Sequence, residues 1–374
     1  MEPFPLIDLQ GSAAERGRQY GQQAKARIHR SIEHYTAQLA SGGHGVGAIH
    51  GWARDFVPRI EAFDPDYVVE MRGIAEGAGV PFEDIVLINA RTEVLQLGKR
   101  SAAAKKDPDG CTGVVVMPEI SSDGALIHAQ NWDWKSECAE TGVVLRIRRD
   151  DGPDILTFVE AGGLARAGLN AAGVAITANY LESDRDYRAL GVPLSLIRRK
   201  VLEQEFVAHA FRAAYTTVKS ASNNIIVSQA GGIAINFECA PDEAFQLHPE
   251  GGLIVHANHF LSPVALGKLK DTGILNTPDS LYRDLRVRSL LQQRLKQAGS
   301  LDVQAVKDAL FDDYQKPWSV CRPPRLNTAG NLSATVAMLV MQPARGVLEI
   351  APLPALNRSF TRYDLSTAAD ARAA

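Results

Sequence analysis

The sequence predicts an α+β fold in which two β-sheets stack face to face and helices cover their outer faces. Three observations indicate this fold. About the first hundred residues carry helical patterns, strand patterns begin only at Cys111, and the strands then fall into blocks separated by pairs of helices. With 374 residues, the chain is long enough for one large domain or for two ordinary ones.

The N-terminal part is predicted to be helical from residue 12 to about residue 97. Residues 13–39 are rich in the helix formers Ala, Gln, Arg and Glu, and Ser41-Gly42-Gly43 marks their end. The glycine-rich residues 43–47 are expected to form a flexible loop. Shorter helices are predicted over residues 52–62, 66–78 and 81–97.

Residues 101–108 have the composition of a linker, because they are small, charged and end in a proline. An exposed linker is a place where cleavage of the chain would be tolerated.

From Cys111 onward, β-branched and apolar runs alternate with helical patterns. Strands are predicted over residues 111–117, 125–129, 141–147, 154–160, 173–179, 223–228, 232–239, 243–248, 252–257, 333–341 and 346–351. Helices are predicted over residues 193–204, 206–219, 278–297 and 301–311. The basic run from Arg198 to Lys200 is interpreted as a solvated helix face.

Composition excludes several classes of function. The formal net charge is -3 and the pI is near 6.3, so neither a nucleic-acid partner nor an anionic membrane partner is indicated. No stretch reaches the length of a membrane span, and the first ten residues lack the pattern of a signal peptide. The four cysteines are scattered without a CxxC pair, so we expect a reduced, cytoplasmic protein with no zinc site.

The candidate active stretch is Asp109-Gly110-Cys111-Thr112, followed by Asn131 and Asp133 after the next strand. Asp-Gly is a turn signal, and Gly110 can adopt backbone conformations that are closed to other residues. The pattern therefore predicts a cysteine at the first position of a strand, with a carboxylate at the end of a neighbouring strand.

This arrangement suits a nucleophile that carries its own base. If the bond between Gly110 and Cys111 is cut, Cys111 gains an α-amine with a pKa of about 7.7–8.0, close to the ~8.5 of a thiol. The amine could take the proton of the thiol, and Asp133 could hold the amine in place. The simpler interpretation is that Cys111 is a small buried hydrophobic residue, since reactivity needs more than a cysteine in a strand.

Several motifs together resemble the isopenicillin N acyltransferase (acyl-CoA:6-aminopenicillanic acid acyltransferase) family, which are self-cleaving cysteine N-terminal-nucleophile hydrolases of the C45 peptidase type. The resemblance extends over nearly the whole chain. It rests on Asp109–Thr112, Gln130–Asp133, His256–His259, Glu15–Gly17 with Tyr20-Gly21, Arg72–Gly79, Asn89–Glu93, and Ser280 with Arg283 and Arg286.

The resemblance implies a four-layer αββα sandwich, self-cleavage between Gly110 and Cys111, and roles for particular residues. It places Cys111 as the nucleophile, Asp133 as the acid that orders its amine, and Asn258 as the amide that binds the oxyanion. We expect Trp132 and His259 to contact the substrate. Some relatives use an arginine before the penultimate strand, where the nearest arginine here is Arg325, so its contact with substrate is in doubt.

No cofactor and no metal are expected, because His256 and His259 lack a third ligand nearby. The expected partner is a small-molecule amide or acyl substrate. After cleavage, residues 1–110 would form a helical α chain and residues 111–374 the nucleophile-bearing β chain. The two fragments are expected to stay associated as one structural unit, and homo-oligomers are left open.

The function predicted from this resemblance is an amidohydrolase or acyltransferase that acts on a linear amide, outside a peptide backbone, through an acyl-thioester. One alternative is an acyl-CoA-dependent N-acyltransferase of the penicillin type. A second is a papain-like enzyme in which Cys111 stays uncleaved and His256 or His259 is the base. A third is a non-catalytic binding protein that keeps the fold.

Overall fold

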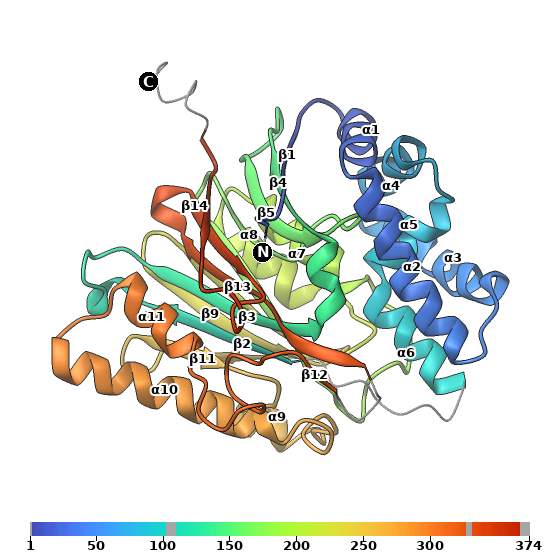
Figure 1. The fold of residues 1–374 in the computed structure, drawn as a ribbon. Helices are drawn as coiled ribbons and strands as arrows, with labels where there is room; N and C mark the ends of the chain where they lie inside the picture. The colour runs from blue at the N-terminus through green and yellow to red at the C-terminus, as the bar shows by residue number, and fades with distance from the viewer. Residues whose placement is uncertain (1, 102–109, 327–330, 367–374) are drawn as a thin grey trace.

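Two β-sheets lie face to face in the middle of the molecule (Figure 1). The computed structural model describes residues 2–101, 110–326 and 331–366. The first sheet has the order β1 (Leu6–Leu9), β4 (Gly142–Ile147), β5 (Ile155–Glu160), β6 (Ala167–Asn170), β7 (Val174–Tyr180), β8 (Asn223–Gln229), β9 (Ile233–Cys239) and β10 (Ala244–Leu247). The second has the order β11 (Leu253–His256), β2 (Gly110–Val116), β3 (Ile127–Lys135), β13 (Leu332–Gln342), β14 (Val347–Pro352) and β15 (Thr361–Asp364), with β12 (Arg325–Leu326) paired to β13.

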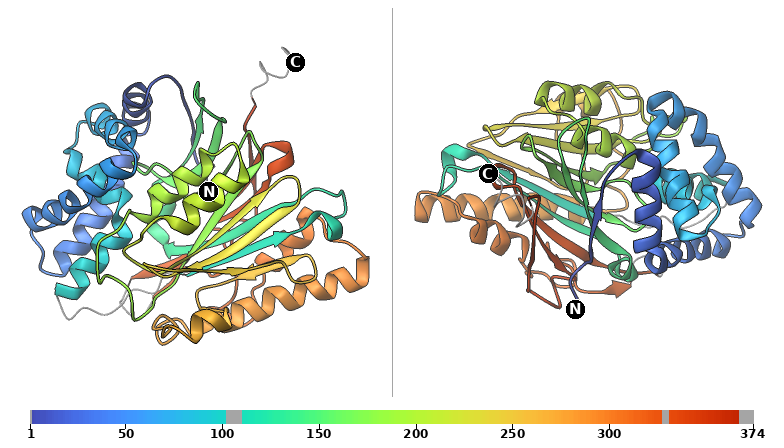
Figure 2. Two further views of the ribbon diagram at one scale, coloured as in Figure 1. Left: turned by 180° about the vertical axis from the view of Figure 1, so that it is seen from behind. Right: turned by 90° about the horizontal axis from the view of Figure 1, so that it is seen from above.

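Pairs of helices cover the outer faces of the two sheets (Figure 2). Helices α7 (Leu194–Leu202) and α8 (Val207–Thr216) pack on the first sheet, against β6 to β9. Helices α10 (Asp279–Ala298) and α11 (Val303–Leu310) pack on the second sheet, and the short α9 (Pro263–Leu266) precedes them. Since β2 and β3 contact β7 across the gap, the layers are helix, sheet, sheet, helix, which confirms the predicted αββα architecture.

The N-terminal helices gather at one end of the sheets, as the blue and cyan parts of Figure 1 show. They are α1 (Ala13–Gln23), α2 (Lys25–Ser41), α3 (Val46–Phe63), α4 (Pro65–Ala78), α5 (Phe82–Asn89) and α6 (Arg91–Ser101). The segment before them is not helical, because β1 pairs in parallel with β4 of the first sheet. The N-terminal part of the chain thus shares a sheet with the part that follows Cys111.

Helices α1 and α4 approach each other closely through glycines. A Cβ on Gly17 would lie 2.2 Å from the carbonyl oxygen of Glu70, and a Cβ on Gly21 would lie 2.3 Å from that of Ile74. On α4, a Cβ on Gly73 or Gly77 would meet the backbone of α1 at 2.6 or 2.4 Å. The early glycine motifs therefore have a packing role, since only glycine fits at these contacts.

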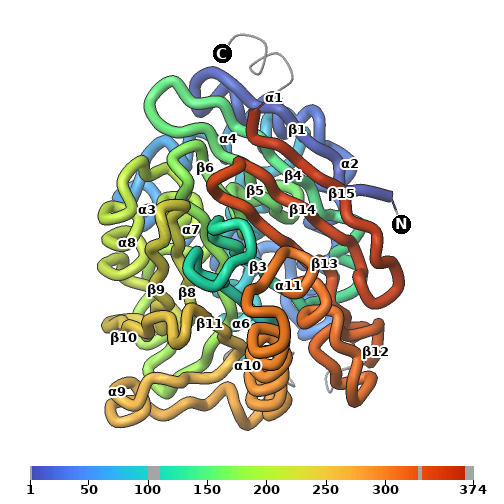
Figure 3. Tube along the Cα trace, turned by 90° about the vertical axis from the view of Figure 1, so that its left-hand side faces the viewer, coloured from blue at the N-terminus to red at the C-terminus, as the bar shows by residue number. Residues whose placement is uncertain are grey.

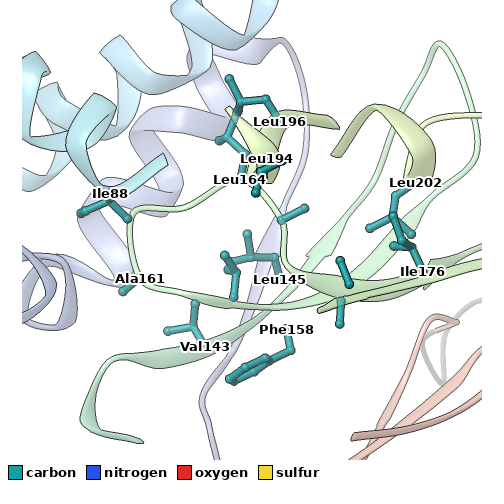
Figure 4. Close-up of a cluster of buried hydrophobic side chains, with 14 of the residues drawn as sticks. Ile88, Val143, Leu145, Phe158, Ala161, Leu164, Ile176, Leu194, Leu196 and Leu202 are labelled. Atoms are coloured by element: carbon teal, nitrogen blue, oxygen red, sulfur yellow. The ribbon is translucent and has the colours of Figure 1, made fainter. Parts of the chain in front are cut away.

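Apolar side chains fill the space between α5, α7 and the first sheet (Figure 4). Ile88 of α5 and Leu194 of α7 are buried in this cluster with Leu145 of β4. This core fixes the start of α7 and the end of α5 against the sheet.

Most predicted elements are present, but several boundaries differ. The predicted helix over residues 13–39 is interrupted at Ala24, and that over 81–97 is interrupted at Ala90. Helix α3 begins at Val46, inside the predicted loop. Strands β1, β6, β12 and β15 were not predicted; each has four residues or fewer, although β10 and β11 are equally short and were predicted.

The polypeptide path in Figure 3 places α10 and α11 directly over the strands of the second sheet.

Within the described ranges, no helix is both long enough and apolar enough to span a bilayer.

Candidate active site

Cys111 and Asp133 lie on the neighbouring antiparallel strands β2 and β3. Gly110 is directly opposite Asp133, and Cys111 is directly opposite Trp132. Directly opposite residues point to the same face of a sheet, so the Cys111 side chain shares the face of Trp132, toward the other sheet. The Asp133 side chain is on the opposite face, next to the peptide that joins Gly110 to Cys111.

Two expectations about this stretch are wrong in detail. Asp133 lies within β3 rather than at the end of a strand, because β3 runs on to Lys135. Gly110 is the first residue of β2, so Cys111 is the second residue of its strand rather than the first. The proposed turn residue Asp109 and the predicted linker over 102–108 lie outside the described residues.

Glycine is needed at position 110 for space. A Cβ there would lie 2.8 Å from Asp133 Oδ2 and 2.9 Å from Arg322 Nη1. Any other residue would collide with one of these two charged groups unless they moved. The glycine lets the carboxylate of Asp133 approach the peptide bond on the N-terminal side of Cys111.

The Asp133 side chain is fully buried, and only one of its two carboxylate oxygens accepts a hydrogen bond from the described residues. Its Oδ1 accepts a hydrogen bond of 2.6 Å from Thr335 Oγ1. Its Oδ2 has no hydrogen-bond partner among the residues that the structure describes, although Arg322 Nε lies 3.4 Å away. A buried carboxylate oxygen without a donor is costly, so this atom has the capacity to accept one.

Asn258 follows β11 and is 2% exposed. Its Oδ1 accepts hydrogen bonds from the backbone N–H of Cys111, at 2.7 Å, and from Arg283 Nη2, at 2.8 Å. Its Nδ2 donates to the carbonyl oxygen of Tyr180 at 2.9 Å, which uses one of two hydrogens. The structure therefore brings Asn258 to Cys111, as predicted, with its oxygen toward the backbone nitrogen.

The first turns of α10 supply side chains that contact the carbonyl group of Cys111 and the backbone of Asn258. Arg283, which is fully buried, donates from Nη1 to the carbonyl oxygen of Cys111 and to Thr112 Oγ1. Ser280 Oγ accepts the backbone N–H of Asn258 at 2.6 Å. Both residues belong to a motif that supported the resemblance, although no role was predicted for either of them.

Two further residues of the site, Asp279 and Arg322, were not predicted from the sequence. Asp279 accepts from Arg283 Nε at 3.0 Å and from Arg322 Nη2. Burial raises the pKa of Asp279, but Arg283 and Arg322 outweigh it and lower the pKa below its usual value. Both residues come from segments remote in sequence from Cys111, and no local pattern marks them.

In the segment before β13, Arg322 rather than Arg325 lies beside the candidate site. Arg322 is 1% exposed and lies beside Asp133, whereas Arg325 stacks its guanidinium over Trp318 at 3.7 Å. Burial, followed by repulsion from Arg322, lowers the pKa of Arg325 to about 10. Along the chain, Arg325 is the arginine nearest to the penultimate strand, whereas in the fold Arg322 is the one beside Asp133.

The predicted substrate-contacting residues are both buried. Trp132 has the Arg166 guanidinium 3.9 Å above its ring and the Phe158 ring 5.7 Å away. His259 Nδ1 lies 2.7 Å from Ser280 Oγ. Burial, then the neighbouring His256 and Arg283, lower the pKa of His259 to about 3, so its ring is neutral at physiological pH.

Neither candidate histidine base is directed at the thiol. His256 Nε2 lies 2.8 Å from Glu238 Oε1, and its Nδ1 lies 3.0 Å from the carbonyl oxygen of Ala257. Among the hydrogen bonds of the described residues, none joins His256 or His259 to Cys111. In the same part of the chain, no group of three or more His, Cys, Asp or Glu side chains is placed to hold a metal ion.

Comparisons with known proteins agree with this architecture. The model of the family acyl-coenzyme A:6-aminopenicillanic acid acyl-transferase matches residues 121–351, more than half of the chain. The chain is 29% identical over 330 residues to the 40 kDa form of acyl-coenzyme A:6-aminopenicillanic-acid-acyltransferase of Emericella nidulans, with 84% of each chain covered.

A solved structure shows the same fold. A mutant conjugated bile acid hydrolase from Clostridium perfringens superposes with a TM-score of 0.50 at 13% identity, covering 68% of this chain and 92% of that one. The fold is therefore that of the N-terminal-nucleophile hydrolases, as predicted.

Proposed function

The chain belongs to the acyl-coenzyme A:6-aminopenicillanic acid acyl-transferase family, and from this premise we propose that it is a self-processed cysteine enzyme that cleaves a linear amide. In this proposal Cys111 becomes the N-terminal residue of a chain 111–374 and forms an acyl-thioester with the substrate. Residues 1–110 stay bound as the other chain.

One observation carries the proposal: the Oδ2 of Asp133, which has no hydrogen-bond donor among the described residues, lies close to Gly110 at the bond between Gly110 and Cys111. An amide N–H at Cys111 already has its acceptor in Asn258. A free amine at the same atom has additional hydrogens, and the buried Asp133 oxygen could accept one of them. The site is therefore better satisfied after cleavage than before it.

Cleavage would begin with attack of the Cys111 sulfur on the carbonyl carbon of Gly110. The C–N bond between Gly110 and Cys111 breaks, its nitrogen takes the thiol proton, and a thioester forms. Water then hydrolyses the thioester, which returns the thiol and leaves a carboxylate on Gly110.

In the processed enzyme, the α-amine of Cys111 would take the proton of its own thiol as the sulfur attacks the substrate carbonyl. Asn258 could donate its second Nδ2 hydrogen to the oxyanion, a contact commonly worth ~3 kcal/mol. The protonated amine then gives its proton to the leaving amine, and an acyl-thioester remains. Trp132 and His259 would line the substrate side of this site.

Water or a second amine can accept the acyl group. We favour hydrolysis because water is always present and no coenzyme A site is identified by the residues. The relative from Emericella nidulans is named as an acyl-coenzyme A acyltransferase, so transfer to an amine is the second candidate.

Two rival mechanisms have less support. The papain-like alternative needs a histidine at the thiol, and the bonds of His256 and His259 lead to Glu238 and Ser280 instead. The non-catalytic alternative gives no reason for a buried carboxylate oxygen beside Gly110 that, among the described residues, has an ion pair with Arg322 but no hydrogen-bond donor.

A trapped intermediate tests this function. The purified protein is mixed with a panel of N-acyl amides, quenched in acid within the first turnover, and measured by mass spectrometry. The proposal expects the fragment 111–374 to gain the mass of the acyl group, on Cys111 after peptide mapping. Turnover of an amide without an acyl group on Cys111 would contradict it, and adding 6-aminopenicillanic acid as acceptor separates transfer from hydrolysis.

A further inference from the structure

A small pocket lies where α5, α6 and α7 meet the loop after β5. Asn89, Arg91 and Glu93 line it from the N-terminal helices, and Arg166 and Arg198 line it from the other side. It opens beside apolar side chains of Ile88, Val159 and Leu194. Its cavity volume, for the centres of water-sized molecules, is about 30 Å³, so it admits one small group rather than a whole ligand.

The charges in this pocket do not balance. Arg91 Nε donates to Glu160 Oε2 at 2.8 Å. Burial raises the pKa of Glu160, but Arg91 and Arg166 outweigh it and lower the pKa, so Glu160 is ionised. The other carboxyl, Glu93, is fully buried and burial raises its pKa, while its Oε1 accepts the backbone N–H of Leu194 at 2.9 Å. Three guanidinium groups thus share the pocket with two carboxyl groups, of which Glu160 accepts a hydrogen bond from Arg91.

Arg198 is the arginine of this pocket with no carboxylate in direct contact among the described residues, since the charge of Glu93 acts on it only at longer range. Although it is only partly exposed, no hydrogen bond or ion pair joins its guanidinium to any residue that the structure describes. Burial, then the positive charges of Arg166 and Arg91, lower its pKa to about 9. A guanidinium in such surroundings is stabilised by an anion, and its planar fork matches a carboxylate in particular.

The pocket is close to the proposed nucleophile. The ionised form of Cys111 is among the groups that favour the charge on Arg198, which places the two within electrostatic reach. Arg166 lies over the ring of Trp132, and Trp132 is directly opposite Cys111 in the sheet. One end of a small molecule could therefore reach the pocket while another part reaches Cys111.

We propose that this pocket is an anion subsite, in which Arg198 with Arg166 binds a carboxylate group of the substrate. The inference rests on the proposed function of Cys111 and specifies its substrate class: a linear amide that carries a carboxylate and an apolar part. The small volume and the flat guanidinium favour a carboxylate over a bulkier anion.

Binding of a matched pair of probes tests the subsite without turnover. Phenylacetate and 2-phenylethanol share a ring and chain but differ in charge, and neither has an amide to cleave. By calorimetry, we expect wild-type protein to bind phenylacetate at least 10-fold more tightly. Arg198→Gln should remove this preference and leave the affinity for the alcohol unchanged. Arg294→Gln, an exposed arginine of α10, changes net charge equally and should alter neither affinity.

If Arg198→Gln does not fold, as judged by its melting curve, Arg198→Lys keeps the charge but loses the fork, and a weaker loss of the preference is expected. Equal affinity of wild-type protein for the two probes would overturn the subsite, as would an unchanged preference in either Arg198 variant. Inorganic phosphate that displaces phenylacetate at lower concentration than acetate does would overturn the carboxylate assignment.

Turnover is measured separately, with N-phenylacetylglycine and its neutral amide, N-phenylacetylglycinamide. If the protein prefers phenylacetate through Arg198 but turns over no amide, the result would contradict the proposed function and support the subsite. If both amides are turned over equally well, the result would contradict the subsite and support the proposed function.

Discussion

At the scale of single residues, the candidate site depends on the absence of a side chain at position 110. Asp133 and Arg322 occupy the space that a Cβ on Gly110 would need, at 2.8 and 2.9 Å. The proposed cleavage requires the Gly110 carbonyl to stay within reach of the Cys111 sulfur. The glycine is therefore expected to matter for processing more than for folding.

Gly110→Ala should slow processing by at least 10-fold, because the new methyl group must displace Asp133 or Arg322 or shift the peptide that is to be cleaved. Mass spectrometry after timed incubation, together with a melting curve, measures the rate and controls for folding. Normal processing of this variant would show that the close approach to Asp133 has no part in cleavage.

The sequence predicted the residues that lie near one another along the chain better than those brought together by the fold. Cys111 and Asp133 belong to two adjacent strands and lie close together in the structure, whereas Asn258, 147 residues from Cys111, was indicated only by the resemblance. Asp279 and Arg322 reach the same place from α10 and from an irregular segment, so only the tertiary structure identifies them.

Burial also decides which charges are solvated, and the sequence does not reveal it. The charge pattern of the run Arg198 to Lys200 favours a solvated face, which is wrong for Arg199. Arg199 is fully buried and pairs with Glu70 at 3.1 Å and Glu203 at 2.8 Å. Its partner Glu70 is more than a hundred residues away, so no local charge pattern could have indicated the pair.

At the scale of elements, α10 delivers the contacts that fix the backbone of Cys111. Arg283 and Arg286 lie almost one turn apart on this helix, but only Arg283 points to the site. Arg286 donates to Asp312 at 2.7 Å and stacks over Tyr314 at the edge of the helix. The two arginines form a matched pair for mutation.

Arg283→Met should lower both the processing rate and turnover by about 10²-fold or more, because the carbonyl of Cys111, Thr112 and Asn258 lose their common donor. Arg286→Met should change them less than 3-fold. Processing is followed by mass and turnover by amide cleavage, with melting curves for both variants. Equal effects of the two substitutions would contradict a specific role for Arg283.

The contact between α1 and α4 gives a second prediction for elements. Gly17→Ala puts a Cβ 2.2 Å from the carbonyl oxygen of Glu70, so overpacking should cost about 1–3 kcal/mol of unfolding free energy. Gly51→Ala, inside α3 with nothing within 4 Å of the new atom, should instead stabilise by about 0.5–1 kcal/mol through helix propensity. Urea unfolding measures the change in unfolding free energy of both variants. Changes of the same sign would contradict the packing account.

The order of helices and strands was largely predictable, since long apolar runs and helix formers carry strong periodicity. The breaks at Ala24 and Ala90 were not, because alanine is a good helix former and no local pattern marks a break there. Strand β1 was missed for a similar reason: four residues gain their stability from β4, which lies far along the chain.

At the scale of the whole molecule, the two sheets are joined by a neutral histidine. His128 of β3 lies 2.8 Å from Ser228 Oγ on β8 and 2.8 Å from Thr177 Oγ1 on β7. Burial lowers the pKa of His128 to about 3, against about 6.5 in an unfolded chain. The unfolded state therefore binds more protons between these two pKa values.

We expect the unfolding free energy to fall in acid, within a defined range of pH. The stability from neutral His128 is fully present above about pH 6.5 and is lost as the pH falls toward 3, with a slope of up to about 1.4 kcal/mol per pH unit. His128→Gln should flatten the pH dependence of the unfolding free energy in this window, whereas the exposed His209→Gln should not. An unchanged slope for His128→Gln, measured by urea unfolding at pH 4–7, would contradict the low pKa.

The shared sheet also bears on the two chains that cleavage would create. Strand β1 lies on one side of the proposed cut and β4 on the other, and they pair along four residues. The helices of the N-terminal part add buried contacts, such as Tyr35 with Trp134 of β3, at 3.2 Å between hydroxyl and indole nitrogen. The fragments would therefore remain one folded unit.

Intact mass spectrometry of the purified protein, with its Cys111→Ala variant alongside, tests the central claim most directly. We expect wild-type protein to show two masses, for residues 1–110 and 111–374, which elute together under native conditions. The Cys111→Ala protein should show one mass for the whole chain, fold normally and turn over no substrate. A wild-type protein that is fully active as a single uncut chain would contradict the account.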